Sequence, residues 1–174
     1  MKDIAIGIDF GTTNSLVSEW GNRRRHELSP FSFLDSRRRP HPSVVWFPTP
    51  NNAVVGLEAK NNLAKDKTPF GGNFFKSIKR RLGQNVEFSL DNGERIPAWK
   101  VASEVFKYLN NHYHENQNKY IKEAVVTVPV DYNGLGRKDV TRAMNAAGIR
   151  VNSFVHEPFA ALISHYYSYE EKLS

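Results

Sequence analysis

The residues best suited to chemistry lie near the start of the chain, in residues 4–15 (Ile-Ala-Ile-Gly-Ile-Asp-Phe-Gly-Thr-Thr-Asn-Ser). The apolar, β-branched beginning of this segment predicts a buried strand that ends at Asp9, and Gly11 allows a tight turn before a second strand. The Asp9 carboxylate can hold a hydrated Mg²⁺, while Gly11, Thr12 and Thr13 offer N–H groups and hydroxyls to a phosphate. The segment is either a phosphate-binding hairpin or an ordinary β-turn, in which the same residue types are common.

Two charged residues further along the chain are candidates for catalysis. Glu157 directly follows a predicted strand and precedes Pro158, so it begins a helix. A carboxylate there is also explained by the helix dipole alone, which is worth about 0.3–1 kcal/mol. Lys79 lies in a basic segment, where a lysine can stabilise the charge on a transferring phosphoryl group. Its structural alternative is one more surface cation, and Lys76 competes for the same role.

The elements that must position these residues follow from apolar periodicity and turn signals. We expect strands at residues 4–9, 16–20, 24–28, 43–47, 53–55, 86–90, 95–96, 124–128 and 151–155. We expect helices from 56 to before 69, from Pro97 through about 113, at 136–147 and from Glu157 onward. A turn is expected at 21–22, a loop at the Pro-, Ser- and Arg-rich residues 29–42, and a short helical turn within 69–83. Leu162, Ile163 and Tyr166 of the last helix are expected to face inward.

This order of elements predicts an α/β fold with a mixed sheet between helices, of the ribonuclease-H type. In such a fold, ligands bind where strands end and helices begin. Asp9, Pro129 and Glu157 all fall at such positions. We therefore expect them to share one side of the molecule.

Composition limits the class of protein. A chain of 174 residues is one domain or a large part of one. It has no apolar run long enough for a membrane helix and no signal-peptide pattern, and it lacks cysteine, so we expect a cytoplasmic protein without disulfides. The net charge of +6 is concentrated in arginine-rich clusters at 23–25, 37–39 and 79–81. Such clusters in loops are more often solvated surface than a nucleic-acid footprint, and the absence of a recognition helix or an aromatic-studded sheet motif argues against nucleic-acid binding.

Several segments resemble one known family. Residues 4–15 are similar to the first phosphate motif of the actin-like ATPase superfamily. Residues 156–161 (His-Glu-Pro-Phe-Ala-Ala) resemble its Glu-Pro-x-Ala-Ala element. Residues 78–83 (Ile-Lys-Arg-Arg-Leu-Gly) and 126–129 (Val-Thr-Val-Pro), the latter followed by Arg137, resemble segments of the seventy-kilodalton heat-shock chaperones of the DnaK type. The chain thus resembles the N-terminal lobe of their actin-like ATPase domain.

The resemblance implies a role for individual residues. Asp9 would organise Mg²⁺ through water, and Gly11, Thr12, Thr13 and Asn14 would hold the phosphates of ATP or ADP. Lys79 would reach the γ-phosphate, and Glu157 would place the attacking water. Pro129 and Arg137 would relay the nucleotide state toward a peptide-binding domain, although residues 134–136 (Gly-Leu-Gly) replace the more polar residues usual before that arginine.

The resemblance also implies an architecture and partners. It implies a five-stranded mixed sheet in a core subdomain of about 1–38 and 97–174, with a smaller α/β subdomain inserted at about 39–96. A second ATPase lobe and a peptide-binding domain, absent from these 174 residues, would complete the chaperone, which would act on unfolded peptides with co-chaperones. The isolated chain would then bind ATP weakly and hydrolyse it hardly at all. The alternatives are an actin-like filament protein of the MreB type, a sugar kinase, or a regulatory actin-fold module without turnover.

Overall fold

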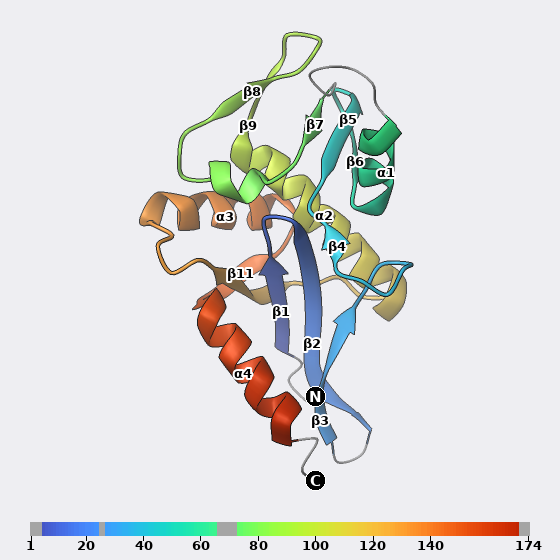
Figure 1. Cartoon of the computed structure of the whole chain (residues 1–174), viewed down its shortest axis with the longest axis vertical. Helices are drawn as coiled ribbons and strands as arrows, with labels where there is room; N and C mark the ends of the chain where they lie inside the picture. The colour runs from blue at the N-terminus through green and yellow to red at the C-terminus, as the bar shows by residue number, and fades with distance from the viewer. Residues whose placement is uncertain (1–4, 25–26, 66–72, 171–174) are drawn as a thin grey trace.

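The computed structural model describes residues 5–24, 27–65 and 73–170 of the chain (Figure 1). Its elements in chain order are β1 (Ala5–Phe10), β2 (Asn14–Arg24), β3 (Glu27–Phe33), β4 (His41–Pro42), β5 (Val45–Thr49), β6 (Asn52–Val55), α1 (Leu57–Lys65), β7 (Phe74–Phe75), the 3-10 helix η1 (Ile78–Arg81), β8 (Glu87–Ser89), β9 (Arg95–Pro97), α2 (Ala98–Gln117), β10 (Glu123–Val128), α3 (Gly134–Ala146), β11 (Arg150–His156) and α4 (Glu157–Glu170).

The main sheet is mixed, with the strand order β11-β10-β1-β2-β3. β1 runs parallel to β10, and β10 runs parallel to β11, whereas β2 is antiparallel to both β1 and β3. The parallel strands β1 and β10 carry the continuous apolar runs expected of strands that are covered on both faces. One strand more than predicted joins the sheet, because the two-residue strand β4 pairs with the beginning of β2.

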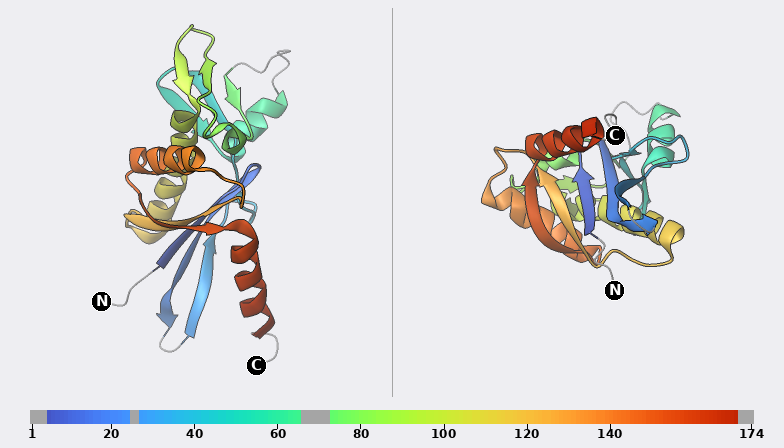
Figure 2. Two further views of the ribbon diagram at one scale, coloured as in Figure 1. Left: turned by 90° about the vertical axis from the view of Figure 1, so that its left-hand side faces the viewer. Right: turned by 90° about the horizontal axis from the view of Figure 1, so that it is seen from below.

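Helices cover both faces of this sheet. The two views in Figure 2 place α2 and α3 on one face and α4 on the other. The long helix α2 supplies the centre of the core, where Phe106 packs against Phe10 of β1 with ring centroids 4.7 Å apart. Its N-cap is Pro97, whose fixed φ suits a helix start. No helix among the described residues is long and apolar enough to cross a membrane.

Two smaller sheets lie beyond the main sheet, at the end where β1 meets β2 (Figure 1). One has the order β6-β5-β7, and the other is the hairpin β8-β9. The 3-10 helix η1 follows β7 and brings this region of the chain back to the end of β1. The predicted helical turn within 69–83 is confirmed as η1, while residues 66–72 lie outside the described residues.

The prediction for residues 21–42 is wrong in two respects. β2 continues through the predicted turn at 21–22, and β3 occupies the first part of the predicted loop. Pro30 lies within β3 opposite Trp20 of β2. Proline is tolerated there because β3 is the edge strand of the sheet, where one side of the backbone needs no partner. Residues 25–26, which fall within the third strand expected at 24–28, lie outside the described residues.

The expected orientation of the last helix is also wrong. Leu162, Ile163 and Tyr166 of α4 are 64%, 40% and 59% exposed. α4 contacts β10 and β11, and Figure 2 shows it on the face of the sheet opposite α2 and α3. An apolar helix face requires a second layer to bury it, and the described chain does not bury these three side chains.

Candidate functional site

The turn between β1 and β2 is tight and presents polar groups to solvent. The β1–β2 ladder ends at the pair Phe10–Ser15, so residues 11–14 form the tip of the hairpin. A Cβ at Gly11 would lie 2.1 Å from the carbonyl oxygen of Asn14, closer than any real contact, so only glycine fits. Thr13 and Asn14 are exposed, and Thr12 is partly exposed. The tip can therefore offer backbone N–H groups and hydroxyls to an anion.

Asp9 ends β1 beside the neighbouring strand β10. The parallel register pairs Gly7 with Val125 and Ile8 with Val126, and its next step brings Thr127 beside Asp9. The Thr127 hydroxyl donates a hydrogen bond of 2.6 Å to Oδ1 of Asp9. This bond orients an exposed carboxylate without neutralising its charge. Asp9 thus remains available to solvent and to a hydrated cation.

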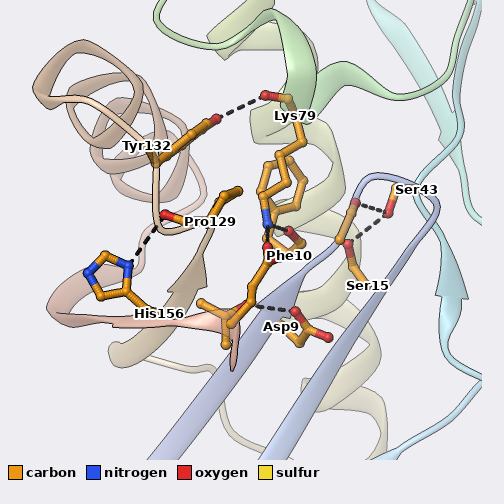
Figure 3. A network of polar contacts seen from close by, with 11 residues as sticks. Asp9, Phe10, Ser15, Ser43, Lys79, Pro129, Tyr132 and His156 are labelled. Carbon is orange, nitrogen blue, oxygen red and sulfur yellow. Dashed lines mark hydrogen bonds and ion pairs between the residues drawn. The ribbon is translucent and has the colours of Figure 1, made fainter. Parts of the chain in front are cut away.

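Lys79 links three segments that are far apart in the sequence (Figure 3). Its buried Nζ donates to the carbonyl oxygen of Phe10 and forms an ion pair with Oε1 of Glu157. The ammonium also lies 5.7 Å from the centroid of the Phe10 ring, a favourable cation–π distance. The predicted alternative, Lys76, is exposed. Lys79 is therefore the lysine that reaches the base of the hairpin.

The backbone around Lys79 is fixed by the start of α3. The Tyr132 hydroxyl donates a 2.9 Å bond to the Lys79 carbonyl, and the N–H of Gly83 donates a 2.8 Å bond to Oδ2 of Asp139. Burial raises the pKa of Tyr132, and the nearby Asp139 and Glu157 carboxylates raise it further, so its hydroxyl stays protonated and can donate. These contacts hold η1 in place and aim the lysine at β1.

Pro129 and Arg137 lie near this site, but within the described part of the chain neither forms a hydrogen bond with Lys79 or Asp9. Nδ1 of His156 lies 3.4 Å from the Pro129 carbonyl oxygen, which ties the end of β10 to the end of β11 (Figure 3). The Arg137 guanidinium lies over the Phe154 ring at 5.7 Å. Its Nε is buried without a hydrogen-bond partner among the described residues. Both residues therefore pack against β11, which leads directly into Glu157.

The donor set fits a magnesium–phosphate group better than a bare metal. Among the described residues, no three His, Asp or Glu side chains cluster closely enough to hold a metal ion. Mg²⁺ usually keeps several waters and binds through one or two carboxylates together with phosphate oxygens. The single exposed carboxylate of Asp9 beside an N–H-bearing tip matches that pattern, and the fixed ammonium of Lys79 supplies positive charge close by.

Sequence reasoning missed Thr127, Tyr132 and Ser43 as members of this site. Ser43 contacts the hairpin tip, as Figure 3 shows. Thr127 could have been found by aligning the two parallel strands at their ends, since both carry a polar residue there. Nothing local marks Tyr132 or Ser43, because their partners are 53 and 32 residues away.

The fold and this site together define an α/β lobe with a phosphate-type hairpin, closed by a lysine and a glutamate from distant segments. The Hsp70 protein family model matches residues 5–91 and 84–172 of the chain. The chain therefore belongs to the Hsp70 family, and it is a nucleotide-binding lobe of the chaperone type. This family has the actin-like ATPase fold, in agreement with the predicted class.

Individual relatives agree with this assignment. The chain is 30% identical over 167 residues to the chaperone protein DnaK of Mycoplasma mycoides, a match that covers 94% of this chain and 26% of the relative. It is 33% identical over 175 residues to a chaperone protein HscA homolog of Rickettsia akari, covering 92% and 28%. It is 31% identical over 166 residues to DnaK of Thermosipho melanesiensis, covering 94% and 26%. The chain thus spans about a quarter of the length of these relatives. The filament alternative is not favoured.

Proposed function

We propose that this chain supplies one side of an ATP-binding cleft in a DnaK-type chaperone that couples ATP hydrolysis to peptide binding and release. The observation that carries the proposal is the convergence of Phe10, Lys79 and Glu157 at one point beside Asp9. A buried ammonium costs several kcal/mol of desolvation, which the ion pair with the Glu157 carboxylate offsets in this chain. A phosphate chain on the hairpin would give the ammonium a second anionic partner at the same point.

The phosphate-binding roles follow from the tip of the hairpin. Gly11, Thr12, Thr13 and Asn14 would bind the phosphates of ATP or ADP through N–H and hydroxyl donors. Asp9, oriented by Thr127, would hold Mg²⁺ through its water ligands. The bound Mg²⁺ would neutralise charge on the phosphates and keep them in one arrangement.

Lys79 and Glu157 would act on the reacting group. The Lys79 ammonium would stabilise the negative charge on the phosphoryl group as it passes to water, and it is already desolvated and fixed. The Glu157 carboxylate is 43% exposed, so water can reach it, and it would orient the attacking water and accept its proton. Pro129 and Arg137 would transmit the change in this cleft, through β11, toward the peptide-binding domain.

We propose the following arrangement of the whole protein. The core subdomain spans about 1–38 and 97–174, the inserted subdomain spans about 39–96, and a second ATPase lobe and a peptide-binding domain complete the cleft and the chaperone. The second lobe would cover the exposed apolar side chains of α4, since patches of this kind mark interaction surfaces. Unfolded peptides and co-chaperones would be partners of the complete, cytoplasmic protein. The 174-residue chain alone would bind nucleotide weakly and turn it over hardly at all.

Calorimetric titration of MgATP into the 174-residue chain tests this proposal. We expect weak binding that is lost in Asp9→Asn, because the amide cannot carry the charge that attracts Mg²⁺ yet can still accept the Thr127 hydrogen bond. Asp91→Asn, which removes an exposed carboxylate in the β8–β9 turn, is the matched control and should bind as the unaltered chain does. Equal binding by all three proteins, or rapid ATP turnover by the isolated chain, contradicts the proposal.

A further inference from the structure

Ser43 is buried directly against the tip of the β1–β2 hairpin, although it lies about thirty residues further along the chain. It follows β4, whose residues Pro42 and His41 pair with Asn14 and Ser15 of β2. Ser43 and Ser15 are both 1% exposed. A short strap, residues 41–43, therefore crosses the hairpin at the place where the phosphate-binding residues are expected.

Ser43 binds two carbonyl groups of the tip. Its backbone N–H donates to the Thr13 carbonyl oxygen at 2.8 Å, and its hydroxyl donates to the Gly11 carbonyl oxygen at 2.9 Å. The Ser15 hydroxyl lies 2.8 Å from the same Ser43 oxygen, and Figure 3 shows this small network beside the tip. Ser43 thus binds the carbonyl oxygens of two peptide groups, the one that joins Gly11 to Thr12 and the one that joins Thr13 to Asn14.

The direction of these carbonyls decides what the tip offers to an anion. A trans peptide is planar, so its N–H points opposite to its C=O, and the described residues contain no cis peptide. Drawing the Gly11 and Thr13 carbonyls toward Ser43 therefore turns the N–H groups of Thr12 and Asn14 away from it, toward the other side of the tip. A carbonyl on that side would repel a phosphate, whereas an N–H group attracts it.

We propose that Ser43 is a positioning residue of the nucleotide site, which fixes the two peptide planes of the tip so that the amides of Thr12 and Asn14 face the phosphates. This inference rests on the proposed function for the identity of the ligand, a nucleotide phosphate. The orientation of the two peptide groups can be tested in the chain without any ligand. The role differs from that of the residues of the tip itself, because Ser43 touches the carbonyl side of the turn and not its ligand side.

The strap is held independently of the Ser43 hydroxyl. The imidazole of His41 bonds the Phe33 carbonyl oxygen through Nε2 and the Tyr108 hydroxyl through Nδ1, both at 3.1 Å. After the strap, the N–H of Gly56 bonds the Val44 carbonyl at 3.0 Å. Replacing the Ser43 hydroxyl should therefore leave the strap in place and, of the two carbonyls, free only that of Gly11.

The test compares Ser43→Ala with Ser15→Ala in the 174-residue chain. Both variants remove one buried hydroxyl and the same contact between the two serines, but only Ser43→Ala frees the Gly11 carbonyl. Residual dipolar couplings of the ¹⁵N-labelled chain without nucleotide report the direction of each N–H bond. We expect the coupling of Thr12 to change in Ser43→Ala and to stay unchanged in Ser15→Ala. The coupling of Asn14 should stay unchanged in both, because Ser43→Ala keeps the backbone N–H that holds the Thr13 carbonyl.

Calorimetry with MgADP adds the functional readout. We expect Ser43→Ala to weaken MgADP binding about tenfold, which corresponds to about 1.4 kcal/mol, and Ser15→Ala to change it less than about twofold. An unchanged Thr12 coupling in Ser43→Ala, or equal loss of affinity in both variants, overturns the inference while the proposed function stands. Absence of MgADP binding by the unaltered chain at millimolar concentration overturns the proposed function instead, and the Thr12 coupling still decides whether Ser43 fixes the peptide plane.

Discussion

Lys79 and Glu157 form an ion pair whose two members should respond very differently to mutation. The Lys79 side chain is 3% exposed, whereas that of Glu157 is 43% exposed. Glu157→Ala leaves a buried ammonium with the Phe10 carbonyl as its remaining hydrogen-bond acceptor among the described residues. Lys79→Met removes the buried charge, keeps a side chain of similar length, and leaves a carboxylate that water can solvate.

The expected magnitudes follow from this asymmetry. Breaking a buried pair by removing one partner typically costs about 3–5 kcal/mol, and the remaining Phe10 carbonyl reduces this to about 2–4 kcal/mol for Glu157→Ala. Lys79→Met loses hydrogen bonds but also removes the desolvation cost of the ammonium, so its net effect should lie within about 1 kcal/mol of zero. The double variant Lys79→Met with Glu157→Ala should be about as stable as Lys79→Met alone, since no buried charge remains.

Urea unfolding followed by circular dichroism measures these differences. With a slope of about 2 kcal/mol per M, Glu157→Ala should lower the midpoint by about 1–2 M and Lys79→Met by less than about 0.5 M. The double variant is the control, because it lacks Glu157 but also lacks the buried ammonium that Glu157→Ala alone would leave unpaired. The reasoning is refuted if Lys79→Met costs as much stability as Glu157→Ala, or if the double variant is less stable than Glu157→Ala, because either result means that the pair contributes net stabilisation.

Two further predictions concern positions outside this pair. Burial, with a contribution from the neighbouring His112, lowers the pKa of His41 below its usual 6.5, so the unfolded chain takes up this proton before the folded one does. The free energy of unfolding should therefore be greatest above pH 6.5 and fall as the pH drops from 6.5 to the lowered pKa of His41. Because glutamine does not titrate, the urea midpoints at about pH 7.5 and 5.5 should differ less in His41→Gln than in the unaltered chain. Gly83→Ala should cost more than about 2 kcal/mol in the same assay, because its φ is +77° and a Cβ would lie 2.6 Å from the N atom of Gly136. Gly93→Ala, at φ +84° with open space around it, is the control and should cost only about 1 kcal/mol; equal losses would mean that the contact with Gly136 has no effect on stability.

Local sequence was a good guide wherever an element carried its own signal. The apolar runs of β1 and β10, the periodicity of α2 after Pro97 and the turn signals between the strands expected at 86–90 and 95–96 all predicted elements that the structure contains. Local sequence failed to predict most of β3, because an edge strand in a sheet can accept Pro30 when the neighbouring strand β2 supplies the pairing. The composition of residues 29–42 describes their local preference, and pairing with β2 overrides it.

The candidate site divides in the same way. Asp9, Thr12 and Thr13 could be named from the sequence because one hairpin carries all three, and Glu157 because residues 156–161 resemble the Glu-Pro-x-Ala-Ala element. The choice of Lys79 over Lys76 rests, in the structure, on burial and on a partner 78 residues away. The contributions of Thr127 and Ser43 likewise depend on strands that meet only in the folded chain.

By itself, the sequence predicted which residues could do phosphate chemistry and that they lie at the ends of strands and the starts of helices, and it determined which family the chain resembles. These properties depend on residue type and short-range spacing, which the chain carries before it folds. The tertiary structure decided which charges meet, which carbonyls of the hairpin are occupied, and which apolar side chains of α4 remain exposed. Such properties depend on packing between segments tens of residues apart, where a shift of one residue in register would change every neighbour.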